Sequence, residues 1–248
     1  MPPMRRLAAT ALLTTGLALP AQAEMTPEER TAFREEVRAY LLENPEVLVE
    51  AMDALQAREN EAAASRDLQM LADNKAAIFE STDDWVGGNP EGDVVLVEFM
   101  DYRCGYCRKA YSEVEELVKS DGNIRFVVKE FPILGEASLM SSQFAIAVRQ
   151  IHGDAAYKAV HDALIELRGE PTVETLTRLA QDLGHEPQPI LDRMNAPEVM
   201  AVIQANHALA DTMEISGTPT FVLKSMMLRG YVPLESMRQI VAEVRAEG

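Results

Sequence analysis

A Cys-x-x-Cys motif stands between a predicted buried strand and a predicted amphipathic helix, and this arrangement constrains the fold more than any other feature. The apolar run 94–100 precedes Cys104 and Cys107, which are the only two cysteines of the chain. After Cys107, apolar residues recur at the i, i+3, i+4, i+7 spacing of a helix. We therefore expect both cysteines on the first turn of a helix that leaves the end of a strand.

The first 23 residues have the pattern of a secretory signal peptide. Arg5 and Arg6 precede a short apolar stretch, and Ala-Gln-Ala at residues 21–23 forms an A-x-A cleavage site. The apolar stretch is too short to span a bilayer, and no other segment is long and apolar enough to cross one. An uncleaved N-terminal anchor is the alternative. Cleavage predicts secretion into an oxidising space, the periplasm in a Gram-negative host, where disulfides persist.

The composition, with 47% hydrophobic and 25% charged residues, is typical of a globular protein with one or two domains. The formal net charge of −17 falls to −19 without the signal peptide, because residues 1–23 contain two arginines and no acidic residue. Such an acidic surface opposes binding to nucleic acid and to anionic lipid. We expect no nucleic-acid partner and no membrane-spanning segment.

The chain divides into three expected parts: the signal peptide at 1–23, a helical arm at 24–80 and a catalytic domain at 81–248. The arm is expected to form one helix over residues 28–43 and a second from residue 45 to residue 79. Pro45 interrupts the pattern because proline cannot continue a helix. Two small apolar patches flank a stretch of alanine and charge, which favours pairing of the arm with another copy of the chain. The alternative is that the arm folds back on the catalytic domain.

The catalytic domain is expected to have the order β–α–β, a helical block, then β–β–α. Residues 85–93 have the composition of a turn-rich linker. Strands at 94–100 and 124–131 should pair in parallel through a right-handed crossover. The remaining expected elements are helical stripes at 140–151, 157–167, 173–183 and 199–213, strands at 220–223 and around 227–228, and a last helix at 234–244.

Three features together resemble the thioredoxin fold of DsbA-type thiol-disulfide oxidoreductases: the Cys-x-x-Cys at a strand-to-helix junction, the helical block, and Thr218-Pro219 before the third strand. The resemblance extends from about Trp85 to the C-terminus. Residues 40–48 of the arm are similar to the N-terminal segment of the suppressor of copper sensitivity protein C branch, which includes oligomeric disulfide isomerases. The resemblance implies an α/β thioredoxin fold with a helical insertion at about 136–214, preceded by the arm. The hairpin at 223–227 lacks the usual turn glycine, which leaves its register open.

The two cysteines are the expected redox-active disulfide, and no cofactor is required. At the first turn of a helix, unpaired N–H groups and the helix dipole favour a negative charge, so an exposed Cys104 should be a reactive thiolate. Cys107 lies one turn deeper and should be the buried resolving thiol. A structural disulfide is an alternative, although so short a loop constrains little of the unfolded chain. Half of a zinc site is another, although the four histidines have no metal-like spacing.

Glu98 is the second candidate catalytic residue. A carboxylate inside an apolar run is costly to bury unless it has a partner or a task. The resemblance assigns it the role of a buried acid that exchanges protons with Cys107, with its pKa raised by desolvation. The alternative is an edge-strand carboxylate that faces water.

The resemblance implies that the Thr218-Pro219 bond is cis and that Thr218 and Pro219 bind substrate. The Thr218 backbone would face outward and pair with an extended substrate segment as an added strand. Proline has no N–H and so keeps a donor away from the thiolate. Gly105 and Tyr106 between the cysteines are expected to tune the redox properties. This dipeptide resembles that of periplasmic disulfide isomerases more than the Pro-His of the strong oxidant.

These features favour a disulfide isomerase or reductase that acts on unfolded or misoxidised exported proteins and is recycled by a membrane redox partner. A general dithiol oxidase of DsbA type is the alternative. A Cu(I)-binding or metal-buffering protein is an alternative of another class, since thiolates and a thioether such as that of Met100 suit this ion. Most of the 13 methionines fall on helical stripes, however, where core packing explains them better.

Overall fold

The computed structural model describes residues 25–246, so the expected signal peptide lies outside the described residues. The described residues form two compact units that divide between Glu59 and Asn60. The smaller unit contains α1 (Pro27–Glu43) and the first part of α2 (Glu46–Asp73), and α1 buries none of its residues. None of the helices between residues 25 and 246 is long and apolar enough to cross a bilayer.

The segment expected as an arm is helical almost throughout, with two interruptions. The first lies at Asn44-Pro45, as the proline predicts. The second was not expected: α2 ends at Asp73, Asn74 hydrogen-bonds back to the carbonyl of Met70 (2.8 Å), and the short helix α3 (Lys75–Phe79) follows. From Asn60 onward this segment belongs to the larger unit, where Leu71 and Ile78 are buried.

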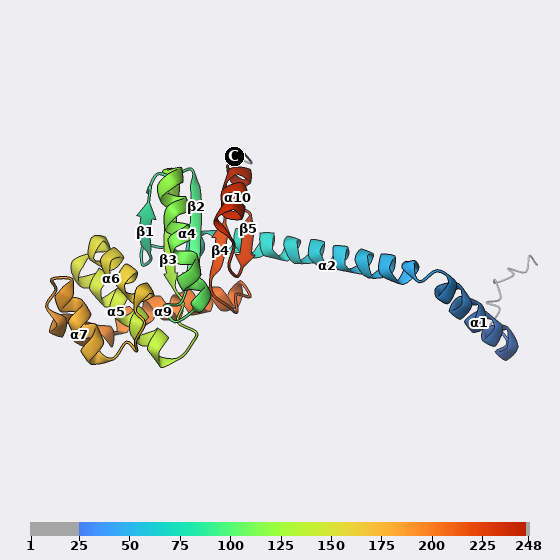
Figure 1. Cartoon of the computed structure of the whole chain (residues 1–248), viewed down its shortest axis with the longest axis horizontal. Helices are drawn as coiled ribbons and strands as arrows, with labels where there is room; N and C mark the ends of the chain where they lie inside the picture. Colours follow the sequence, from blue (N-terminus) through green and yellow to red (C-terminus); the bar gives the residue numbers. More distant parts are fainter. Residues whose placement is uncertain (1–24, 247–248) are drawn as a thin grey trace, which may run out of the picture. The chain divides into compact units, whose positions relative to one another are not determined.

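The larger unit is built on a five-stranded mixed sheet with the strand order β1-β3-β2-β4-β5 (Figure 1). The strands are β1 (Trp85–Gly88), β2 (Val94–Met100), β3 (Ile124–Glu130), β4 (Thr220–Leu223) and β5 (Met226–Arg229). The central pair, β2 and β3, is parallel, and the other neighbours are antiparallel. The predicted β–α–β unit is therefore confirmed, and β2 is an interior strand with partners on both sides.

Strand β1 corrects the expectation of a linker over residues 85–93. It pairs with β3 at the sheet edge, Trp85 opposite Val128 and Gly88 opposite Arg125. Glycine is required at position 87, because a Cβ atom there would lie 2.1 Å from the ring of Trp85. A glycine-rich segment has little strand propensity of its own, so the pairing depends on β3 and on the packing of the Trp85 ring.

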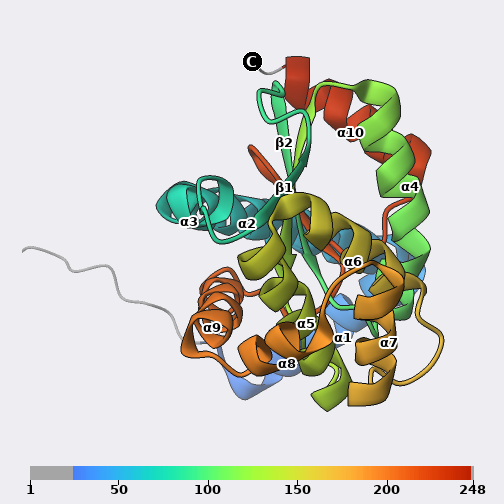
Figure 2. The same cartoon turned by 90° about the vertical axis from the view of Figure 1, so that its left-hand side faces the viewer.

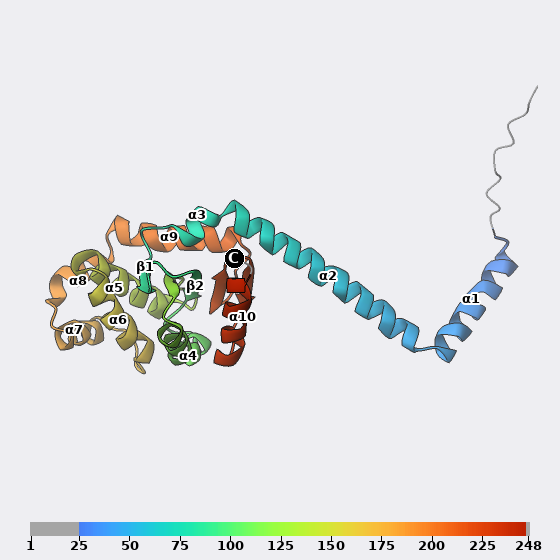
Figure 3. The same ribbon diagram turned by 90° about the horizontal axis from the view of Figure 1, so that it is seen from above.

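The two faces of the sheet carry separate hydrophobic cores, as the twofold side-chain period of a strand requires. Leu96, Met100 and Phe126 face α4 (Gly105–Asp121) and α10 (Leu234–Ala246). Val97 and Phe99 face the other way, toward α3 and α9 (Pro197–Thr212). Figures 2 and 3 show α4 and α10 on one side of the sheet and α3 and α9 on the other. The fold is the thioredoxin-like α/β fold that the sequence predicts.

The helical insertion contains one helix more than expected. It consists of α5 (Glu136–His152), α6 (Asp154–Glu166), α7 (Val173–Asp182), α8 (Pro187–Met194) and α9. The additional helix is α8, whose eight residues bury only Ile190 and Met194. So short a helix shows no repeated apolar stripe, and for that reason the periodicity did not reveal it.

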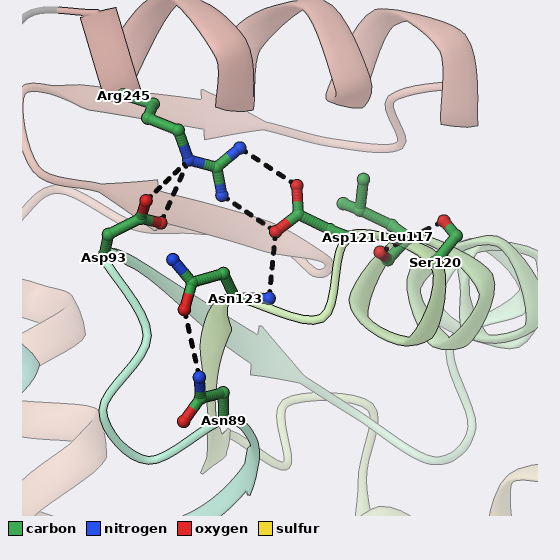
Figure 4. Close-up of polar contacts among 7 residues, drawn as sticks. All are labelled: Asn89, Asp93, Leu117, Ser120, Asp121, Asn123 and Arg245. Atoms are coloured by element: carbon green, nitrogen blue, oxygen red, sulfur yellow. Dashed lines mark hydrogen bonds and ion pairs between the residues drawn. The ribbon is translucent and has the colours of Figure 1, made fainter.

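The end of the sheet opposite the Cys-x-x-Cys motif is fastened by Arg245 near the end of α10 (Figure 4). Its Nε donates to both carboxylate oxygens of Asp93 (3.0 and 2.9 Å), and its terminal nitrogens donate to Asp121 at the end of α4 (3.0 and 2.8 Å). One guanidinium thus joins the last helix, the segment before β2 and the end of α4. The β4–β5 hairpin closes with Leu223 opposite Met226 and a two-residue turn, which settles its register.

Candidate active site

The two cysteines lie where β2 passes into α4, and a buried carboxylate shapes the loop between them and the sheet. Asp101 is fully buried and accepts hydrogen bonds from the amides of Arg103 (2.7 Å), Ile133 (2.8 Å) and Leu134 (3.1 Å). Its own carbonyl accepts from the amide of Cys104 (3.1 Å). Asp101 thereby holds the segment before α4 against the loop that follows β3. No sequence pattern indicated this role for Asp101.

Cys104 is the N-cap residue of α4 and is more enclosed than expected. The sequence predicted an exposed residue on the first helical turn, but Cys104 is only 7% exposed. Its Sγ lies 3.1 Å from the carbonyl oxygen of Thr218, to which the protonated thiol donates. Thr218, which encloses the Cys104 sulfur, lies 114 residues further along the chain. No local sequence pattern predicts a contact over that separation.

The pKa of the Cys104 thiol is lowered to about 5. The largest cause is the hydrogen bond that the Cys107 thiol donates to the Cys104 sulfur; the Thr218 side chain and the amides of Cys107 and Tyr106 add to it, and burial opposes it. These amides belong to the first turn of α4, where they have no partner within the helix. The contact with the Thr218 carbonyl favours the protonated thiol and so acts to raise the pKa of Cys104. The hydrogen-bond donors to the sulfur lower this pKa by more.

Cys107 lies on the apolar face of α4 and is 1% exposed. Its pKa is raised, first because its thiol proton is held by the Cys104 sulfur, then because it is buried and lies near Glu98. Both cysteines are free thiols in this structure. The pair therefore combines an ionisable sulfur at the helix end with a protonated sulfur beneath it, as a nucleophile and a resolving thiol require.

Glu98 is buried in the middle of the sheet, with Val128 of β3 on one side and Phe221 of β4 on the other. An edge-strand carboxylate facing water is therefore ruled out. Its pKa is raised to about 8, chiefly by burial and then by the charges of Cys104 and Glu115. Glu98 and Cys107 line one small cavity of about 10 Å³. That volume is close to the minimum that one water molecule needs.

The Thr218-Pro219 peptide bond is cis, as the resemblance implies. Strand β4 starts at Thr220 and runs antiparallel to β2, which brings this bond to the same end of the sheet as Cys104. The Thr218 carbonyl faces the Cys104 thiol, and the Pro219 carbonyl accepts from the amide of Gly230 (2.9 Å). The expectation that the Thr218 backbone is turned fully outward is thus corrected for its carbonyl.

Gly105 and Tyr106 occupy the exposed first turn of α4. No heavy atom outside the immediate chain lies within 4 Å of where a Cβ on Gly105 would be, and the Tyr106 side chain is 63% exposed. Within the part of the chain that is described, the dipeptide reaches the Cys104 sulfur through the Tyr106 amide. Any effect of Gly105 and Tyr106 on the redox properties of the cysteine pair therefore acts through the Tyr106 backbone amide and through the open space that they leave for a substrate.

A second buried carboxylate was missed. Glu130 at the end of β3 accepts hydrogen bonds from the hydroxyls of Tyr102 (2.7 Å), Tyr157 (2.6 Å) and Ser142 (2.7 Å). Burial raises its pKa to about 7, while these three donors oppose the rise. It stands at the end of an apolar strand in the same way that Glu98 stands inside one, and that signal could have identified it.

The described residues contain no group of three or more His, Cys, Asp or Glu side chains arranged to hold a metal ion. Met100, which the sequence analysis considered as a soft ligand, is buried and lines the same cavity as Cys107.

Two family models match the chain. The model described as "Thioredoxin" matches residues 80–243, which is more than half of the chain. The model described as "Copper resistance protein ScsC N-terminal domain" matches residues 29–62.

Solved structures extend the comparison. A thioredoxin-like oxidoreductase from Silicibacter pomeroyi DSS-3 is 39% identical and aligns over 70% of this chain and 98% of its own, with a TM-score of 0.66. Salmonella enterica Typhimurium BcfH is 27% identical over 88% of this chain and 96% of its own, with a TM-score of 0.73. A curated relative, the Na(+)/H(+) antiporter NhaA 3 of Salinispora tropica, is 29% identical over 66% of this chain but only 26% of its own. The chain spans about a quarter of the length of the curated relatives that it matches first.

Proposed function

The chain belongs to the thioredoxin family of thiol-disulfide oxidoreductases, and we propose on that premise that it acts in the periplasm as a disulfide isomerase or reductase for exported proteins. The observation that carries the proposal is the pairing of an ionisable Cys104, at the start of α4, with a buried, protonated Cys107. Such a pair supplies both a nucleophile and a release step without a cofactor.

In the proposed cycle, the Cys104 thiolate attacks a substrate disulfide and forms a mixed disulfide, and one substrate sulfur leaves as a thiolate. A substrate thiol can then displace Cys104, which reshuffles the substrate disulfide. Alternatively Cys107 attacks Cys104, the Cys104–Cys107 disulfide forms, and the second substrate sulfur leaves. For that step the Cys107 thiol must lose its proton, and a buried thiol needs a nearby base.

Glu98 is the proposed proton acceptor. While Cys104 is a thiolate, its charge helps to keep the pKa of Glu98 raised, so the carboxyl holds a proton. In the mixed disulfide that charge is gone, and the pKa of Glu98 falls, although burial still holds it above its ordinary value. A larger share of Glu98 is then deprotonated, so its carboxylate can accept a proton in the one state that needs it. When the Cys104–Cys107 disulfide is reduced, Cys107 is the leaving sulfur, and the same carboxyl returns the proton to it.

Substrate binding is assigned to Thr218 and Pro219, which lie at the same end of the sheet as Cys104. An extended substrate segment would pair with the Thr218 backbone as an added strand once Cys104 is ionised and no longer donates to the Thr218 carbonyl. Tyr106 and Leu134 are 63% and 53% exposed. Large exposed apolar side chains near a reactive thiol favour unfolded chains over folded surfaces, which fits misoxidised clients.

The arm is proposed to join copies of the chain and so to favour isomerisation over simple oxidation. On α1, Phe33, Val37 and Tyr40 lie on one helical face and are 59%, 40% and 54% exposed. Among the described residues none of those in α1 is buried, and an amphipathic helix is stabilised when another copy covers its apolar face. Two or more facing active sites would enclose a substrate. A general dithiol oxidase remains the alternative.

Export and recycling complete the proposal. The signal-peptide pattern at residues 1–23 and the absence of a membrane-spanning helix between residues 25 and 246 support a periplasmic protein. A membrane redox partner would return the cysteine pair to its working state after each cycle.

Replacing Phe33 and Tyr40 together by glutamine tests the role of the arm in the full-length protein. The double variant is expected to be monomeric by light scattering and to reactivate scrambled ribonuclease roughly tenfold more slowly, because facing active sites no longer share a substrate. Oxidation of a dithiol peptide should stay near the wild-type rate. Glu35→Gln, on another face of α1, is the control. A monomeric wild type, or a monomeric variant with full reactivation, would refute this role.

Binding of Cu(I) is the second candidate, favoured by the position of Met100 on the same cavity as Cys107. Thiolate and thioether sulfurs are ligands that this ion prefers. Tight stoichiometric uptake of Cu(I) by the reduced protein, together with failure to reactivate ribonuclease or reduce insulin, would favour this function over the first.

A further inference from the structure

A buried histidine shares the cavity beneath the cysteine pair. His161 of α6 is 4% exposed and lines the same cavity of about 10 Å³ as Glu98 and Cys107. In the sequence, the four histidines were weighed only as zinc ligands, and no pattern gave His161 a role. Its position places an imidazole beside the two groups between which a proton must pass.

The hydrogen bonds of His161 assign its tautomer. Its Nδ1 lies 3.1 Å from the hydroxyl oxygen of Tyr102, and that hydroxyl donates its single proton to Glu130 (2.7 Å). The Tyr102 oxygen can therefore only accept from His161, so Nδ1 carries the proton. In a neutral imidazole the other nitrogen, Nε2, then has a free lone pair. Nε2 makes no hydrogen bond with another described residue, and His161 is one of the residues that line the cavity.

An aromatic frame fixes the ring of His161. Its centroid lies 6.4 Å from that of Trp85, 5.8 Å from Tyr157, 5.5 Å from Tyr102 and 5.9 Å from Tyr111. Burial lowers the pKa of His161 to about 4, so the ring is neutral at neutral pH and Nε2 is an acceptor. A rigid, neutral acceptor is suited to orienting a proton and poorly suited to taking one up.

Other charged groups also face this region. On α6 itself, Asp162 raises the pKa of His161 and Lys158 lowers it, and both act less strongly than burial. From α4, Glu115 and Tyr111 line the cavity, and Glu98 reaches it from β2. None of these groups causes Nε2 to be protonated at neutral pH, because the pKa of His161 stays low and the ring stays uncharged.

We propose that His161 is a positioning residue for the resolving step: its Nε2 accepts a hydrogen bond in the cavity and so orients the proton that passes between Cys107 and Glu98. The proposal rests on the proposed function, in which Glu98 exchanges that proton. In the step, the S–H bond of Cys107 breaks and an O–H bond forms on Glu98. The Cys104–Cys107 bond forms as the substrate sulfur leaves. His161 keeps its own proton throughout.

The test separates attack from resolution with an aromatic disulfide that releases a coloured thiol. Reduced protein releases one equivalent when Cys104 attacks and a second when Cys107 resolves the adduct, so stopped-flow gives both rates. His161→Phe keeps an aromatic ring but has no acceptor, and we expect its second phase to slow about tenfold with the first phase unchanged. His161→Gln restores an acceptor and should resolve within about threefold of wild type.

Two further variants make the outcome decisive. The double variant with Glu98→Gln and His161→Phe should resolve no more slowly than Glu98→Gln alone, because both act on one proton transfer. Tyr102→Phe keeps the ring and removes the partner of Nδ1 together with one of the three donors to Glu130. It replaces His161→Phe in the test if that variant loses its near-ultraviolet circular dichroism. Its second phase should slow about threefold.

A wild-type second phase in both His161→Phe and Tyr102→Phe, or equal slowing by Phe and Gln at position 161, would overturn the proposal. Failure of the proposed function gives a different result: Glu98→Gln would resolve at the wild-type rate, or the wild-type protein would show no first phase.

Discussion

Replacing Cys107 by serine is expected to trap client proteins on Cys104 as mixed disulfides. The serine hydroxyl still donates a hydrogen bond to the Cys104 sulfur, so the thiolate persists, but no thiol remains to release the client. Turnover in the reduction of insulin should fall by roughly 10³-fold or more. Non-reducing electrophoresis of cells that express the variant should show adducts that disappear on reduction.

Cys104→Ser is the matched control for that experiment. It should lose turnover to the same extent but form no adducts, because Cys107 is 1% exposed and its pKa is raised. Adducts on Cys104→Ser, or none on Cys107→Ser, would show that the two roles are assigned the wrong way round.

Asp84→Asn is expected to destabilise the protein severely. Asp84 forms an ion pair with Lys129, and both side chains are 1% exposed. The amide of Asn206 also donates to Asp84 (3.3 Å). Removing the carboxylate leaves the Lys129 ammonium buried without a countercharge, which costs about 3–5 kcal/mol. Denaturant unfolding followed by circular dichroism should show this loss as a lower midpoint with an unchanged slope.

Asp67→Asn is the control, because Asp67 pairs with Arg229 (2.7 Å) where the side chains are 20% and 43% exposed. Such a pair contributes about 0–1 kcal/mol. Replacing Asp84 by leucine together with Lys129 by methionine should recover most of the loss, since neither charge then stays buried. An Asp84→Asn protein as stable as Asp67→Asn would contradict the account of this pair.

The sequence predicted the parts of the fold that are built from local periodicity. The parallel pair β2 and β3 corresponds to two apolar-rich runs of seven residues, and helix α4 and four helices of the insertion follow apolar stripes over ten or more residues. Strand β1 and helix α8 do not, because each is short and depends on packing against distant elements. The interruption at Asn74 likewise has no proline or glycine to announce it.

The active site was predictable to the extent that its residues adjoin in sequence. The burial of Cys107 follows from its place on the apolar face of α4, and the burial of Glu98 from its place in β2. The enclosure of Cys104 by Thr218 and the joint position of His161 and Glu98 arise from elements that are far apart along the chain. No local sequence pattern predicts which residues far apart along the chain lie next to one another in the fold.

The low pKa of Cys104 also makes stability depend on pH in the reduced protein. Because the folded pKa lies below the ordinary value of a free thiol, the thiolate stabilises the reduced form at alkaline pH, and this contribution is lost as the pH falls through about 5. The reduced state is thus favoured at neutral pH, as a protein that attacks substrate disulfides requires.

Titration of the Cys104 thiolate by its ultraviolet absorbance tests the central claim most directly. In the reduced protein we expect one transition with a midpoint near pH 5, absent from Cys104→Ser and shifted upward in Cys107→Ala, which lacks the hydrogen-bond donor that contributes most to the lowered pKa. A transition near the ordinary thiol value of about 8.5, or one that Cys107→Ala leaves unmoved, would contradict the account.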